Sequence, residues 1–125
     1  MSDGVRHPQL RGLLIAALEA LCDPAFQQRV WIRGEIDPRD RYHVDFDQVV
    51  HTIWDDLRFG EAPLRSIGFT TRNRDEADAV AAVAAGIDGL LERYGTDRSD
   101  EEYMRTPEWT ELGTLARSAL HTLTA

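Results

Sequence analysis

Asp47, His51 and Asp55 are spaced four residues apart and are the residues whose types and spacing come nearest to a reactive site. Residues at this spacing project from the same face of a helix, so two carboxylates would flank one imidazole. Carboxylate and imidazole together suit a divalent zinc, manganese or iron ion. Most such sites recruit a ligand from another element, and His43 is the nearest further candidate. One hypothesis is therefore a metal-binding protein or metal-dependent enzyme that uses His43, Asp47, His51 and Asp55.

The alternative interpretation is a solvated helix face. These side chains lie roughly opposite the apolar stripe that contains Val49 and Ile53, so they are expected to face water. The chain contains no His-x-x-x-His or Glu-x-x-His pair, which are the more specific signals for a metal site on a helix. We therefore favour the solvated face, for which no cofactor is needed.

Other catalytic patterns are weaker still. The sequence has no Gly-x-Ser-x-Gly elbow, no glycine-rich phosphate loop and no metalloprotease spacing. Asp55 and Asp56 are adjacent on the expected helix and point about 100° apart, which is poor geometry for sharing a proton. The single cysteine, Cys22, ends an apolar helical pattern, where a small packing residue is expected. The sequence favours a protein without catalytic activity and leaves the question open.

Charge is the most informative global property. The net charge is −8, which argues against nucleic acid as a direct partner because phosphate binding needs clustered cations. Segment 35–61 holds eight acids against three arginines, and segment 97–111 holds six against two. Such a concentrated field can steer association with a basic protein. The candidate acidic contacts are Asp37, Asp40, Asp45, Asp47, Asp55, Asp56, Glu61, Asp100, Glu101, Glu102 and Glu108.

Each of the three tryptophans falls in an apolar helical stripe, which favours core packing with the indole N–H bonded to a polar partner. Trp109 has a second interpretation, because it opens a helix between Glu108 and Glu111. A tryptophan beside an acidic patch is typical of an interface anchor, so Trp109 joins the candidate contacts.

The elements expected to position these residues are helices. Apolar residues recur at i, i+3, i+4 and i+7 over 10–21, 46–57, 77–91 and 109–123. Asp23 with Pro24 predicts a short helix that stops at Gly34, and Asp45 is expected to be an N-cap. Ser99 with Glu102 predicts a capping box, and Thr106 followed by proline predicts the start of the last helix. The helix over 77–91 is expected to end at Gly95, and Gly86 and Gly89 weaken it or permit close helix contact. The sequence predicts one all-α domain over 1–125, a bundle of about four main helices plus short ones. A short extended segment near 64–71 is left open.

Location and assembly follow from hydrophobicity. The chain has no apolar run of about 18 residues, and its polar start lacks the hydrophobic region of a signal peptide. We therefore expect a cytoplasmic protein with no membrane partner. Leu64, Ile67 and Phe69 are spare apolar residues through which a homodimer could form.

Three stretches carry a resemblance: "LLIAALEALCDPAFQQRVWIRG", "VVHTIWDD" and "PEWTELGTLARSAL". Together they resemble an uncharacterised family of small, acidic, helical actinobacterial proteins with no established function, and "LCDPAFQQRVW" is the most specific piece. The resemblance implies no catalytic residues. By size and charge the chain is also similar to immunity proteins, which neutralise a cognate toxin. The leading hypothesis is an acidic interaction module that binds a basic partner, and the metal site is its alternative.

Overall fold

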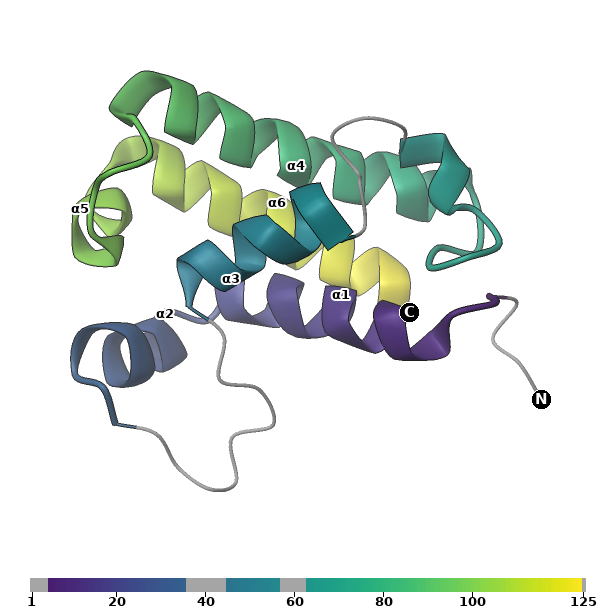
Figure 1. The fold of residues 1–125 in the computed structure, drawn as a ribbon, viewed down its shortest axis with the longest axis horizontal. Coiled ribbons are helices and arrows are strands. Elements are labelled where there is room, and N and C mark those ends of the chain that lie inside the picture. The colour runs from purple at the N-terminus through teal and green to yellow at the C-terminus, as the bar shows by residue number, and fades with distance from the viewer. Residues whose placement is uncertain (1–4, 36–44, 57–62, 125) are drawn as a thin grey trace.

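The computed structural model describes residues 5–35, 45–56 and 63–124 (Figure 1). It is 77% helical, and its described residues form no strand, which confirms the predicted all-α class. In chain order the elements are α1 (Pro8–Leu21), α2 (Pro24–Phe26), the π-helix η1 (Gln27–Ile32), α3 (Phe46–Val50), the π-helix η2 (His51–Asp56), the 3-10 helix η3 (Pro63–Ser66), α4 (Arg74–Tyr94), α5 (Asp100–Met104) and α6 (Pro107–Thr124).

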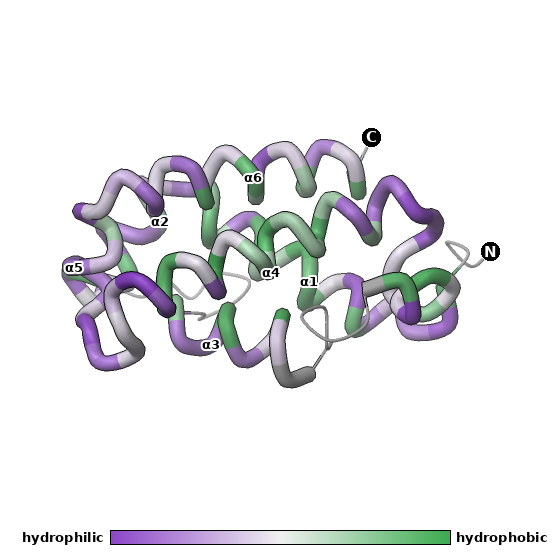
Figure 2. Tube along the Cα trace, turned by 90° about the horizontal axis from the view of Figure 1, so that it is seen from above, coloured by the Kyte–Doolittle hydropathy of each residue, from purple (hydrophilic) through white to green (hydrophobic). Residues whose placement is uncertain are grey.

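The core lies between the three long helices, with α3 and η2 packed against α1. The most extensive contact is between α4 and α6, which lie side by side above α1 in Figure 1. Hydrophobic positions recur along all three long helices in Figure 2. The largest fully buried side chains are Leu14, Leu18, Leu21, Gln27, Val49, Ile53, Val80, Ile87, Leu90, Leu112 and Leu123.

Helix α1 begins at Pro8, whose missing N–H is not needed in a first turn. The predicted stripe is buried at Leu14, Leu18 and Leu21, but Leu13 is 41% exposed. Arg11 is instead among the buried residues. The prediction of an inward-facing Leu13 is therefore wrong, because the packed face of α1 is rotated toward Arg11.

Two predicted helices change type along their length. The Asp23 side chain caps α2 by accepting from the Phe26 N–H at 3.1 Å, as predicted. The chain then continues as η1, in which Arg33 N–H donates to the Gln28 carbonyl at 3.1 Å, an i→i+5 bond. Likewise, residues 46–57 were expected to form one α-helix, but α3 ends at Val50 and η2 follows. Hydrophobic spacing alone carries no signal for this change.

Helix α4 begins after Asn73, whose side chain accepts from the Glu76 N–H at 3.0 Å, and it ends at Gly95. Gly95 has φ +82°, a left-handed conformation that favours glycine, so the predicted stop is confirmed. Val83 and Leu90 are fully buried in α4, although the predicted stripe had placed Leu91 inward.

The predicted start signals of the last two helices are confirmed. Ser99 and Glu102 form a complete capping box at α5, with side chain-to-backbone bonds of 3.2 and 3.1 Å. Thr106 Oγ1 accepts from the Trp109 N–H at 3.2 Å at the start of α6. These caps fix where the acidic first turn of α5 lies.

Residues 64–71 form η3 followed by a turn that is closed by an isolated bridge between Ile67 and Thr71. The backbone N–H groups of Arg6 and His7 donate to the carbonyls of Gly68 and Phe69, both at 2.9 Å. Extended pairing in the described part of this segment is limited to this one bridge and these two hydrogen bonds, and no strand forms. Leu64, Ile67 and Phe69 are exposed, as a homodimer contact would require.

A buried polar network closes one end of the bundle. The Arg11 guanidinium donates to both carboxylate oxygens of Glu76, at 2.8 and 3.2 Å, and both side chains are 4% exposed. It also donates to the carbonyls of Thr70 and Leu123, each at 2.9 Å. This one side chain therefore connects α1 to α4, to the turn before α4 and to the end of α6.

A second buried polar group lies at the opposite end of α1. The Gln27 amide nitrogen donates to the carbonyls of Ala20 and Leu21, at 2.7 and 3.0 Å. Its oxygen accepts from the Trp109 indole at 3.2 Å. Gln27 thereby satisfies carbonyls left open where α1 ends, and it attaches η1 to α6.

Candidate partner-binding surface

The first acidic segment is anchored at the start of α3. Asp45 accepts from the Gln48 N–H at 2.8 Å and so caps the helix, as its position in the sequence predicted. Asp47 lies in the first turn, and both aspartates are exposed. Both carboxyl groups therefore lie at the N-terminal end of α3.

The second acidic segment reaches the same place. Asp100, the first residue of α5, is half-buried, and this burial raises the pKa of its carboxyl above the ordinary value. The negative charges of Asp45 and then Asp47 raise the pKa further, while a hydrogen bond from the Phe46 N–H acts in the other direction. Two segments more than fifty residues apart in sequence thus bring three carboxylates within electrostatic reach of one another. We call Asp45, Asp47 and Asp100 the acidic surface.

The neighbouring acids of α5 are exposed but have cationic partners. Glu101 accepts from Arg105 at 2.6 Å, and Glu102 accepts from Arg98 at 3.2 Å. The backbone N–H of Ser99, followed by Arg98, lowers the pKa of the Glu102 carboxyl. Their charge is therefore partly compensated by arginines on either side of α5, and Asp45, Asp47 and Asp100 form the more concentrated negative site.

Glu108 and Trp109 at the start of α6 have different roles. Glu108 lies 3.8 Å from Arg93, and hydrogen bonding to its carboxylate raises the pKa of the Tyr94 hydroxyl. Trp109 is only 8% exposed and packs edge-on against Trp31 and Phe46, with centroids 5.9 and 5.0 Å apart. The structure thus places Trp109 in the core, which was the favoured interpretation of its sequence position, and little of it is left for a partner.

Several predicted contacts lie outside the described residues, namely Asp37, Asp40, His43 and Glu61. Asp55 and Asp56 belong to η2, but their side chains are not described. The remaining predicted acids are distributed over the starts of α3, α5 and α6.

Two of the proposed metal ligands, Asp47 and His51, have side chains within the described residues. Asp47 and His51 are both exposed, as the solvated-face interpretation predicts. Over the described ranges, no group of three or more His, Cys, Asp or Glu side chains is arranged to hold a metal ion. His43 and the Asp55 side chain lie outside the described part of the chain, so the metal site stays a prediction.

Cys22 is half-buried, and this burial raises the pKa of its thiol. A raised thiol pKa leaves little thiolate at neutral pH, so Cys22 is a poor nucleophile. Its Sγ lies 3.6 Å from the Glu19 carbonyl, a contact within its own helix end. This environment is that of a packing residue.

Sequence reasoning missed the buried partners of two polar side chains, Arg11 and Gln27. The only signal available was their position on or next to an apolar stripe. The partners of Arg11 are 59 to 112 residues away in sequence, and Trp109 is 82 residues from Gln27, although Gln27 also bonds to the nearby carbonyls of Ala20 and Leu21. No helix in the described part of the chain is long and apolar enough to cross a membrane.

Fold and surface together define a small, acidic, all-α bundle in which two distant acidic segments meet. The chain belongs to the family described as Domain of unknown function (DUF7945), whose model matches residues 5–125. This confirms the expectation of a family with no established function. No curated protein and no solved structure matches the chain.

Proposed function

We propose that the protein is a non-enzymatic interaction module whose acidic surface binds a basic partner protein. The main observation in support is that the fold brings Asp45, Asp47 and Asp100 near one another from two separate segments of the chain. The fold keeps like charges together here even though burial and repulsion disfavour the charged form of Asp100. A cationic partner would offset this repulsion, so the local electrostatics favour its binding.

The partner class follows from the charge of the whole chain. A net charge of −8 repels polyanions and raises the encounter rate with a cationic protein, especially at low ionic strength. We propose an immunity-type role in the cytoplasm, in which the module covers a basic surface of a cognate toxin. The capped first turns of α3 and α5 support this role because the caps fix the backbone that carries these carboxylates.

The experiment compares two variants of equal net charge. In the test variant, Asp45→Asn, Asp47→Asn and Asp100→Asn neutralise the acidic surface, and asparagine at position 45 keeps the N-cap of α3. In the control variant, Glu19→Gln, Asp78→Asn and Asp88→Asn remove three exposed carboxylates of α1 and α4. Both proteins and the wild type are immobilised, and lysate of the source organism is passed over them at low and high salt.

We expect the wild type and the control variant to retain the same basic protein at low salt and to release it at high salt. The test variant should retain at least about tenfold less, since several close charge pairs are lost together. Equal retention by all three proteins, or retention that does not depend on salt, would contradict the proposal.

A further inference from the structure

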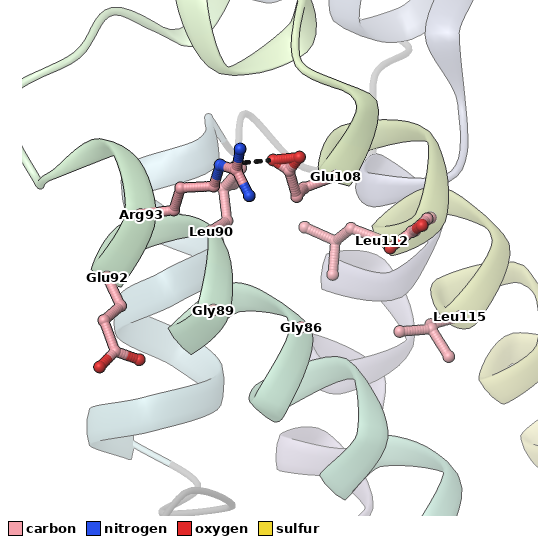
Figure 3. A pocket seen from close by; sticks show the side chains of 9 residues that line it. Gly86, Gly89, Leu90, Glu92, Arg93, Glu108, Leu112 and Leu115 are labelled. Carbon is pink, nitrogen blue, oxygen red and sulfur yellow. Dashed lines mark ion pairs between the residues drawn. The ribbon is translucent and has the colours of Figure 1, made fainter.

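Helices α4 and α6 leave an open groove of about 440 Å³ between them (Figure 3). Its apolar lining comes from Leu90 of α4 and from Leu112 and Leu115 of α6. Leu115 is 36% exposed and is among the large apolar side chains that the described residues present to solvent. In Figure 2, α6 and α3 lie on opposite sides of α4, so this groove is separate from the acidic surface at the start of α3.

Two glycines of α4 line the groove. At Gly86 a Cβ atom would meet Leu112 Cδ1 at 3.1 Å and Leu115 Cδ1 at 3.3 Å, so this glycine lets the two helices approach closely. At Gly89, one turn further along, an added Cβ would have no neighbour within 4 Å. Gly89 is exposed, so the lining of the groove is open to solvent at this position.

The edge of the groove is acidic. Its lining includes Glu92, Glu108 and Glu111 but only one cation, Arg93. Glu108 Oε2 is shielded from solvent and has no hydrogen-bond donor, because Arg93 Nε lies 3.8 Å away (Figure 3). Arg93 is already the ion-pair partner of Glu108, so the exposed carboxylates of Glu92 and Glu111 are the ones that a cation from a partner can reach.

We infer that this groove binds one amphipathic helix of a cationic partner, with a small or aliphatic residue over Gly89 and a lysine or arginine beside Glu111. The lining matches helix-in-groove recognition, in which an apolar stripe enters the groove and charges pair at the edge. A second copy of this chain fits less well, because it would bring a further net charge of −8 against the same acids. The inference rests on the proposed function for the basic character of the partner.

The probe is a synthetic helical peptide with leucine and alanine on one face and lysine beside them. Its binding to the ¹⁵N-labelled protein is followed by amide chemical shifts, for which Gly86 and Gly89 are reporters inside the groove. We expect saturable shifts of both glycines with a Kd below about 1 mM, and no shifts with a peptide in which glutamate replaces lysine.

Two variants test the site. Gly89→Leu places a bulky side chain at the open side of the groove, and the open space around the Cβ position means that the fold tolerates it. It should weaken binding by at least about tenfold, whereas Glu111→Arg should weaken it about three- to tenfold and reduce its salt dependence. The matched control is Ala82→Leu, an exposed position two turns earlier on α4 that does not line the groove. It should bind as the wild type does.

Failure here is distinguishable from failure of the proposed function. Absence of binding at a peptide concentration of about 1 mM, which equals the weakest Kd expected, overturns the inference that the groove binds a helix. Equal affinity of the wild type and Gly89→Leu for the peptide overturns it as well. Shifts confined to residues around Asp45 and Asp100 also overturn it, and they leave the proposed function intact. In contrast, equal capture of a basic protein by the acidic-surface variant overturns the proposed function without bearing on the groove.

Discussion

The guanidinium of Arg11 and the carboxylate of Glu76 form a two-point ion pair in the interior, at 2.8 and 3.2 Å. Glu76 also accepts from the Arg72 N–H at 2.7 Å, so both of its carboxylate oxygens accept hydrogen bonds. The pair joins the starts of α1 and α4, which are 65 residues apart.

Removing one partner of this pair should be strongly destabilising. We expect Glu76→Ala to lower the free energy of unfolding by about 3–5 kcal/mol, because Arg11 is left as an unpaired buried charge. Asp78→Ala is the control, since its pair with Arg74 is exposed at 3.6 Å and is worth about 0.5 kcal/mol. Urea unfolding measures both. A double variant, Arg11→Met with Glu76→Leu, should be less destabilised than Glu76→Ala, and a larger loss would contradict this account.

The same pair predicts a loss of stability in acid. Burial by itself raises the pKa of Glu76, but hydrogen bonds and charge from Arg11 and Arg72 outweigh it and lower the pKa below its ordinary value. A carboxyl with a lowered folded-state pKa stabilises the protein above the unfolded-state pKa, and this contribution is lost as pH falls through the lowered value. Thermal unfolding of the wild type and Glu76→Gln should therefore differ most near neutral pH and converge in acid.

Asp100 should show the opposite pH dependence. Its pKa is raised by burial and by the charges of Asp45 and Asp47, so its ionisation destabilises the fold as pH rises through the carboxyl range. We expect Asp100→Asn to stabilise the protein at pH 7 by less than about 1 kcal/mol and to have no effect below the ordinary carboxyl pKa. Asp97→Asn, in the exposed loop before α5, is the control. A destabilised Asp100→Asn at neutral pH would show that the carboxylates do not repel one another.

Gln27 should be sensitive to substitution even though it is uncharged. Gln27→Leu removes the donor to two carbonyls and the acceptor of the Trp109 indole, leaving buried groups unsatisfied. The expected cost is about 2–4 kcal/mol. Gln28→Leu, on the exposed side of η1, should cost less than about 0.5 kcal/mol. Chemical unfolding followed by tryptophan fluorescence compares the two, and equal costs would argue against the bridge.

The glycines of α4 should respond differently to alanine. Gly89→Ala meets no neighbour and should stabilise the protein by about 0.5–1 kcal/mol through helix propensity. Gly86→Ala gains the same propensity but meets Leu112 and Leu115 at 3.1 and 3.3 Å, which should cancel the gain. The difference in thermal midpoint measures the close approach of α4 and α6. Equal midpoints would show that the leucines move aside freely.

Much of the local structure was predictable from short patterns. Asp23, Asp45, Ser99 and Thr106 cap the helices that their positions indicated, and Gly95 ends α4 with a positive φ. These signals depend on the few residues around a helix end, so the linear sequence contains them. The π-helices and the outward position of Leu13 were not predictable, because they depend on which neighbours each helix packs against.

The candidate surface was predictable in composition but not in geometry. Counting charges identified both acidic segments, yet only the structure shows Asp100 beside Asp45 and Asp47 while Glu101 and Glu102 pair with arginines. Likewise, Gly86 and Gly89 read in sequence as weak points of a helix, and the fold makes them part of a groove.

The sequence by itself determined the all-α class, the helix ends and the negative charge, because periodicity, caps and composition are local or additive properties. Tertiary structure alone decided which polar side chains are buried, which acids meet and where α4 and α6 leave an opening. The physical reason is that these features arise from contacts between residues far apart in the chain, and a pattern within one helix does not specify the neighbour on which that helix packs.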